Sequence, residues 1–290
     1  MLTIAVGIKN RAEQLGLTLS SVLHHSSEAL KASEVELLVI DEESTDGLED
    51  LLLQVRDYFN TIRLVQIDVK RAGVDIVSGS ATITTNLAFL LAGGNRVLKF
   101  QPETLFLKDN IAFMLRNEDL GKRVPFANTF SGQAKLSPEM VVDVQYNAPL
   151  LDHRAYHVNQ PGVSYHLAQD AEVGTALVAS DLGSPFYPYV WGCAKDLFLE
   201  SGLIDIDFMS GWAAEDDFMM LRLAQAGGEL QVVDDMQAYH LWHKSSGRFR
   251  GGPFHKRNIN VLNGLRDIEP DEFQRRAQRN KDLSLKCILG

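Results

Sequence analysis

The 290-residue chain is 45% hydrophobic and 23% charged, a composition typical of soluble globular proteins and far from that of disordered or fibrous chains. Its formal net charge is -10, which argues against binding to a long polyanion such as nucleic acid, because phosphate neutralisation needs clustered cations. The charge is uneven, since residues 244–290 contain 11 basic and 5 acidic residues. One large domain or two closely joined ones would fit this length.

The cysteines and the N-terminal segment indicate the cellular compartment. Cys193 and Cys287 are too few for a secreted disulfide framework, so free thiols in a reducing compartment are expected. The apolar run 2–8 is too short to span a membrane and lacks the basic lead of a signal peptide. We therefore expect a cytoplasmic protein, with peripheral membrane contact through the basic C-terminal segment left open.

The first hundred residues alternate short apolar runs with helical periodicity. Asn10 can cap the first helix, whose apolar positions begin at Leu15. The pattern predicts four strands, at 2–8, 35–41, 61–68 and 96–101, and further helices at 48–58 and 81–92. Such alternation predicts parallel strands with crossover helices, hence an α/β fold.

The second part of the chain has a weaker pattern. Residues 133–188 contain five prolines and are expected to form a loop-rich connection. A helix is predicted at 215–226, ended by two glycines, and a short strand at 230–233. No internal repeat is present.

Polar residues follow the predicted strands, where ligands bind in open α/β sheets. These residues are Lys9, Asn10, Arg11, Asp41, Gln101 and Glu103. No strand is followed by Gly-x-Gly-x-x-Gly and no P-loop motif occurs, so a dinucleotide-binding fold and a P-loop are both poorly supported.

The densest candidate for catalysis is the acidic run Glu215, Asp216 and Asp217. Neighbouring carboxylates raise each other's proton affinity, which suits a general base acting on a hydroxyl. Acids also favour the first turn of any helix, so a purely structural interpretation competes. Trp191 and Trp212 lie nearby in the sequence and could stack on a sugar ring or fill a core.

Two histidines and a basic stretch follow. His240 and His243 could converge on a metal, with Glu103 supplying the hard oxygen that Mg or Mn prefers, but two histidines are often structural. Arg248 and Arg250 lie among glycines and lysines, a composition that suits a mobile lid over a diphosphate or a solvated loop.

Several of these segments together resemble the family 2 glycosyltransferases and related enzymes with the GT-A fold. The segment 36–47, Glu-Leu-Leu-Val-Ile-Asp-Glu-Glu-Ser-Thr-Asp-Gly, is similar to the family's strand ending in Asp-Asp-Gly-Ser-Thr-Asp. The region 192–228 resembles the Trp-Gly-x-Glu-Asp region of chondroitin-polymerase-like and galactosyltransferase-like members, and the similarity extends to His243. It implies one catalytic domain, with a nucleotide-binding half at 1–105, an acceptor-binding and catalytic half at 106–243, and a basic lid and helical tail at 244–290.

The resemblance also implies roles for individual residues. Asp216 corresponds to the catalytic base, Glu215 to an acceptor contact and His240 to a metal ligand, joined here by His243. Donor contacts are implied for Asp41, at the base, and for Lys9, Asn10, Arg11 and Asn86. From their own chemistry, Gln101, Arg248 and Arg250 are expected to contact the donor as well. Acceptor contacts are expected from Trp191, Trp212 and Asp217.

One departure from the family concerns the metal. The family's Asp-x-Asp aligns with Gln101-Pro102-Glu103. Gln101 can hydrogen-bond a ribose hydroxyl but does not bind a cation as a carboxylate does, whereas Glu103 keeps that chemistry. A Mn or Mg cofactor is therefore expected at Glu103 and His240, with weaker binding than the family's Asp-x-Asp provides.

The leading hypothesis is an inverting glycosyltransferase of polysaccharide biosynthesis that moves a sugar from a nucleotide-diphosphate donor, a UDP-sugar, to a hydroxyl of a glycan or similar acceptor. A non-catalytic subunit that binds a sugar nucleotide or glycan is the main alternative, motivated by Gln101. A nucleotidyltransferase is a weaker alternative. Such an enzyme would need a glycine-rich loop with Lys or Arg directly after the first strand, and residues 7–11 match that pattern only in part. The sequence does not indicate an oligomeric state.

Overall fold

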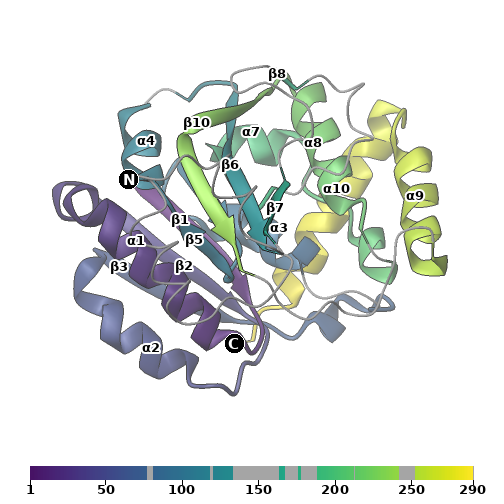
Figure 1. Cartoon of the computed structure of the whole chain (residues 1–290). Coiled ribbons are helices and arrows are strands. Elements are labelled where there is room, and N and C mark those ends of the chain that lie inside the picture. Colours follow the sequence, from purple (N-terminus) through teal and green to yellow (C-terminus); the bar gives the residue numbers. More distant parts are fainter. Residues whose placement is uncertain are drawn as a thin grey trace.

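The computed structural model describes residues 1–76, 81–117, 120–132, 163–166, 176–177, 188–211, 213–241 and 252–289 (Figure 1). The predicted α/β class is confirmed, because a central sheet is flanked by helices. Most of the paired residues in the sheet lie in parallel pairings.

The N-terminal half is a run of parallel strands joined by helices. Its strands are β1 (Leu2–Ile8), β2 (Val35–Asp41), β3 (Thr61–Gln66) and β4 (Arg96–Phe100), close to the predicted bounds. Its helical elements are α1 (Ala12–Ala32), α2 (Leu48–Val55), the 3-10 turns η1 (Arg56–Tyr58) and η2 (Val69–Ala72), and α3 (Ala81–Leu91). β1, β2 and β4 are buried along almost their whole length because both faces of this part of the sheet are covered, whereas β3 at the edge is partly exposed.

The expected capping of α1 by Asn10 is wrong. Arg11 occupies the N-cap position, and Asn10 has a left-handed backbone with φ 51°. The backbone N–H of Ala12 donates instead to the Asp46 carboxylate at 2.7 Å. The cap comes from the neighbouring loop because β1 and β2 end side by side, a proximity that local sequence does not show.

The second half extends the same sheet with strands of both directions. Its strands are β5 (Thr104–Phe106), β6 (Arg123–Gly132), β7 (Val163–His166), β8 (Ala176–Leu177), β9 (Val190–Ala194) and β10 (Glu229–His240). Its helices are α4 (Asn110–Arg116), α7 (Lys195–Glu200), the 3-10 turn η5 (Ile206–Ser210), α8 (Glu215–Gln225), α9 (Pro253–Leu265) and α10 (Pro270–Lys286).

The strand order is β3-β2-β1-β4-β9-β6-β10-β5 in the described residues, with β7 and β8 paired outside this path. β9 runs antiparallel between β4 and β6, and β5 antiparallel to β10. The strand predicted at 230–233 continues to His240 across an irregularity between Val233 and Gln237. The sheet is thus continuous through both predicted halves of the chain.

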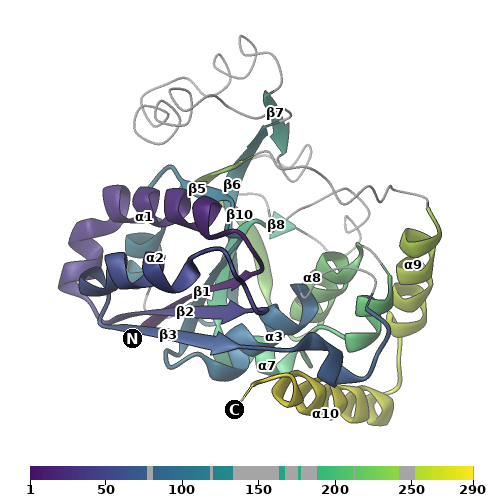
Figure 2. The same cartoon turned by 90° about the horizontal axis from the view of Figure 1, so that it is seen from below.

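Two hydrophobic cores lie on opposite faces of the sheet. Figure 2 shows α1 and α2 on one face and α3, α7 and α10 on the other. The first core contains Leu15 and Leu19 of α1, and the second contains Phe89 of α3 and Trp191 of β9. No helix among the described residues combines the length and apolar character needed to cross a membrane.

Candidate active site

A cleft of about 430 Å³ opens at the carboxyl ends of the parallel strands. Most of its lining comes from the ends of β1 and β4, the residues after β1, β2 and β4, and the N-terminal parts of α3 and α8. It is lined by Gly7, Ile8, Lys9, Arg11, Glu42, Ala81, Thr84, Thr85, Lys99, Gln101, Pro102, Glu103, Pro188, Trp191, Glu215, Asp216 and Met219. Six of the residues predicted for the donor, metal and catalytic sites therefore meet there, together with Trp191.

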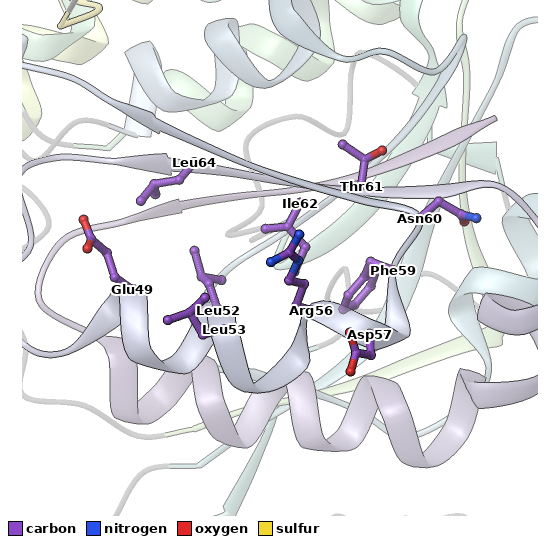
Figure 3. Close-up of a pocket in the computed structure, with 10 residues that line it drawn as sticks. All are labelled: Glu49, Leu52, Leu53, Arg56, Asp57, Phe59, Asn60, Thr61, Ile62 and Leu64. Carbon is purple, nitrogen blue, oxygen red and sulfur yellow. The ribbon is translucent and has the colours of Figure 1, made fainter.

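A larger groove of about 680 Å³ lies at the outer edge of the sheet, between α2 and β3 (Figure 3). Leu52, Leu53 and Ile62 contribute apolar surface to it. None of the residues predicted to bind a ligand lines it, and its acids do not form a convergent cluster. The cleft at the strand ends is therefore the candidate active site.

Glycine is required at one point of the cleft wall. A Cβ atom on Gly7 would lie 2.4 Å from the Thr84 hydroxyl oxygen, far inside normal contact. The absence of a side chain lets the end of β1 approach α3 closely. Both residues line the cleft, so this close contact shapes the cleft wall.

The loops after β1 and β2 are bonded to each other. The Lys9 ammonium pairs with the Glu42 carboxylate at 2.6 Å, and Asn10 accepts the backbone N–H of Thr45 at 2.9 Å. The Asp41 carboxylate accepts the backbone N–H of Ser44 at 3.0 Å and is almost fully buried. Glu42, and not Asp41, lines the cleft.

Glu103 lies at the centre of a group of nitrogen-bearing side chains. One of its carboxylate oxygens is 3.5 Å from the Arg11 guanidinium and 3.7 Å from the His240 imidazole. His240 reaches it because β10 pairs with β5 in a register that places His240 opposite Thr104. The Tyr189 ring stacks on His240 at 4.2 Å between centroids.

This arrangement partly fits a divalent cation. Glu103 and His240 are nearly buried and present an oxygen and a nitrogen, which Mn²⁺ accepts. No cluster of three such ligands occurs among the residues that the structure describes, and Arg11 approaches the same oxygen. The pair suits a metal shared with phosphate oxygens of a ligand better than one held by protein alone.

The acidic run stands at the start of α8, as predicted. Glu215 and Asp216 line the cleft. Burial, then repulsion from Glu215 and Asp217, raises the pKa of Asp216 well above its usual range, while the Lys99 ammonium acts in the opposite direction. Burial likewise raises the pKa of Glu215. A carboxylate with a raised pKa binds a proton more tightly than an ordinary aspartate or glutamate does, which suits a general base.

Lys99 lines the cleft but is not among the residues predicted from the sequence. It lies in β4, is 8% exposed, and its ammonium donates to the backbone carbonyl of Phe100 at 3.1 Å. Burial lowers the pKa of Lys99 to about 8, with Asp216 and Glu103 acting against that change. A lysine inside a buried strand, two residues before the polar strand end at Gln101, was the signal that could have identified it.

Comparisons with known proteins bear on the fold. No family model and no curated protein matches the sequence. Among solved structures, TarS 1-349 of S. aureus in complex with UDP-GlcNAc matches with a TM-score of 0.62 and 12% identity, over 98% of this chain and 72% of that one. The GT-A fold is therefore shown.

Two further structures have the same fold. The longer S. aureus TarS chain matches with a TM-score of 0.59 and 15% identity, over 94% of this chain and 41% of that one, so the present chain spans less than half of it. Mannosyltransferase PcManGT from Pyrobaculum calidifontis, in complex with GDP-Man and Mn2+, matches with a TM-score of 0.51 and 14% identity, over 97% and 69%.

Within this GT-A fold, Asn86 lies away from the cleft. Its side chain is fully buried, donates to the carbonyl of Ile204 at 2.9 Å and accepts the N–H of the same residue at 2.9 Å. Because both ends of the amide are occupied by this backbone, the implied donor contact does not fit. Asn86 holds the segment that leads towards η5.

The other predicted residues divide into three groups. Trp191 lines the cleft with little surface, being 2% exposed and stacked on Phe89 at 5.3 Å, so it is mainly a core residue. Asn10 and Asp217 stand next to cleft residues without lining it. Trp212, His243, Arg248 and Arg250 lie outside the described residues, as do most of 133–188 and residues 244–251 of the basic stretch. The end of that stretch, 253–257, lies in α9 rather than in a loop.

Proposed function

We propose that this protein is a nucleotide-sugar-dependent glycosyltransferase that transfers a sugar, with inversion, to a hydroxyl acceptor. The single observation that carries this proposal is the convergence of Asp216 and Glu103 on one cleft of a GT-A fold, with Arg11 and Lys99 beside them. A base and a set of cations in one cleft provide for both ends of a displacement reaction. A UDP-sugar is the proposed donor, since TarS binds UDP-GlcNAc in a similar fold.

In the proposed reaction, Asp216 accepts the proton of an acceptor hydroxyl. The hydroxyl oxygen forms a bond to the anomeric carbon on the face opposite the diphosphate. The bond from that carbon to the diphosphate oxygen breaks, and its electron pair stays on the departing nucleoside diphosphate. Arg11 and Lys99 stabilise the growing negative charge, and Gln101 bonds a ribose hydroxyl.

A divalent cation is proposed to assist the reaction without being strictly required. Glu103 and His240 would hold it, and when bound it would supply further positive charge next to the diphosphate. Arg11 and Lys99 supply positive charge at the same carboxylate in any case, so partial activity in EDTA is expected.

The test uses isothermal titration calorimetry and release of UDP from UDP-GlcNAc. The wild type is expected to bind UDP. With UDP-GlcNAc, it is expected to release UDP slowly as the sugar is transferred to water or to an acceptor. Asp216→Asn is expected to keep UDP binding within about twofold and to lose UDP release by 10²-fold or more, the order of magnitude associated with a general base. Unchanged turnover in this variant would exclude Asp216 as the base.

The matched control is Asp196→Asn, an acid in the first turn of α7 that does not line the cleft. It should leave binding and turnover unchanged. If the wild type binds UDP tightly but releases none across donors that include GDP-Man, the non-catalytic alternative is favoured. If it binds no nucleotide, the proposal is wrong.

A further inference from the structure

The residues just before the acidic run have an unusual backbone. Ala213 and Ala214 have φ angles of 61° and 68°, in the left-handed region that residues with a Cβ rarely adopt. Two such residues in succession persist only where surrounding contacts hold them. They connect directly to Glu215 and Asp216, so their conformation sets where the first turn of α8 begins.

Asn258 of α9 makes the contact that holds this turn. Its side-chain amide donates to the carbonyl of Ala213 at 2.7 Å and to the carbonyl of Phe208 at 3.0 Å, and the residue is fully buried. Both partners are carbonyl oxygens, so the group that faces them must be the NH₂. A single side chain therefore bonds the backbone on both sides of Gly211.

Gly211 shows how closely the two segments pack. A Cβ atom on this residue would lie 2.0 Å from the Asn258 side-chain oxygen and 2.8 Å from the Phe254 carbonyl. Any other residue would push α9 away from the turn and break the amide contacts. Gly211 is therefore needed for the approach of Asn258, and not for its own φ of -135°.

We propose that Asn258 is a positioning residue, which holds the 213–214 turn in its left-handed conformation and thereby places Asp216 in the cleft. The catalytic part of this inference depends on the proposed function; the structural part does not. Without the amide, the turn relaxes towards ordinary φ angles and the first turn of α8 moves. A displacement of about 1 Å of a reacting group can cost on the order of 10²-fold in rate.

The first test compares Asn258→Ala with Asn280→Ala. Asn280 is a matched control, because its buried amide accepts the N–H of Ile206 at 3.2 Å, upstream of the acidic turn. Hydrogen exchange of peptides that cover 211–218 should quicken at least tenfold in Asn258→Ala and change little in Asn280→Ala. Equal protection in the two variants would overturn the inference.

The second test uses UDP release from UDP-GlcNAc. In Asn258→Ala, kcat should fall by at least tenfold with KM and UDP binding within about threefold of the wild type, because the nucleotide-side residues stay in place. Glycine at both 213 and 214 accepts left-handed angles without strain, so Ala213→Gly with Ala214→Gly should restore part of the lost kcat. An unchanged kcat in a folded Asn258→Ala, or no rescue by glycine, would contradict the positioning role.

These outcomes separate the two proposals. If the wild type releases no UDP, the proposed function fails while the hydrogen-exchange result still tests whether Asn258 holds the turn. If the wild type is active and exchange at 211–218 is unaffected by Asn258→Ala, the positioning role fails and the proposed function stands. Asn258→Asp is a second variant in case Asn258→Ala does not fold, since it keeps the size and removes the NH₂ donors.

Discussion

Lys99 and Asp216 together predict how the rate of the proposed reaction depends on pH. Because the pKa of Asp216 is raised, the carboxylate that acts as base is lost as pH falls through that raised value, so activity should fall off at a higher pH than for an ordinary aspartate. Because the pKa of Lys99 is about 8, its positive charge is lost as pH rises through that value. A bell-shaped profile with its basic limb near pH 8 is expected.

Substitutions of Lys99 test this interpretation. Lys99→Arg keeps the charge at all accessible pH values, so the basic limb should disappear. Lys99→Met removes the cation that opposes protonation of Asp216, so the acidic limb should move to higher pH. The measurement is kcat for UDP release from pH 5 to 10, and circular dichroism controls for folding. A basic limb that remains in Lys99→Arg would show that another group causes it.

Asp216→Asn should also change stability. A carboxyl group with a raised pKa in the folded state binds its proton more tightly than in the unfolded chain, so above that pKa its ionisation destabilises the fold. Replacing it with a neutral amide removes this cost, and Tm at pH 8 should rise. About 1 kcal/mol corresponds to roughly 2–4 °C in a domain of this size. A lower Tm at pH 8 would contradict the raised pKa.

At the scale of elements, the C-terminal helix α10 anchors the segment that leads to the acidic turn. Arg276 bonds Asp205 at 3.1 Å and Asp207 at 3.0 Å, and Arg279 bonds Asp207 at 2.7 Å. Asp205 is 1% exposed, so its charge needs these partners. Burial raises the pKa of Asp207, but the hydrogen bonds from Arg279 and Arg276 outweigh it and leave the pKa below its usual value.

Arg276→Ala should therefore destabilise the protein by about 3 kcal/mol, because it leaves the buried Asp205 carboxylate with Arg279, at 3.7 Å, as its remaining cationic partner. Urea unfolding followed by circular dichroism measures this. Arg275→Ala is the control, since Arg275 is mostly exposed, pairs with Glu272, and should cost less than about 1 kcal/mol. Similar losses in the two variants would mean that the link between α10 and η5 is unimportant.

At the scale of the whole molecule, ligand binding should stabilise the fold. A ligand that binds the folded state at 100 times its Kd adds about 2.7 kcal/mol. UDP at that excess should therefore raise Tm by several degrees, and Mn²⁺ should add to the effect if Glu103 and His240 hold it. A thermal-shift titration with EDTA as control measures both. No shift with any nucleoside diphosphate would argue against the cleft as a donor site.

Much of the fold could be predicted from the sequence because the signals are local. Strands buried on both faces appear as continuous apolar runs, and helices by their period, so the order of elements and the bounds of β1, β2 and β4 followed directly. The acidic run at the start of α8 was visible for the same reason. Residues that follow strands were correctly expected at one edge of the sheet.

The remaining features depend on contacts between segments far apart in the chain. Glu103 meets Arg11 and His240 only because β1 lies beside β4 and the register of β5 with β10 brings His240 to the same end. Asn86 was expected at the donor and is instead bonded to Ile204. Local sequence determined which residues carry charge at the strand ends, and the order and register of the strands decided which of them face one another.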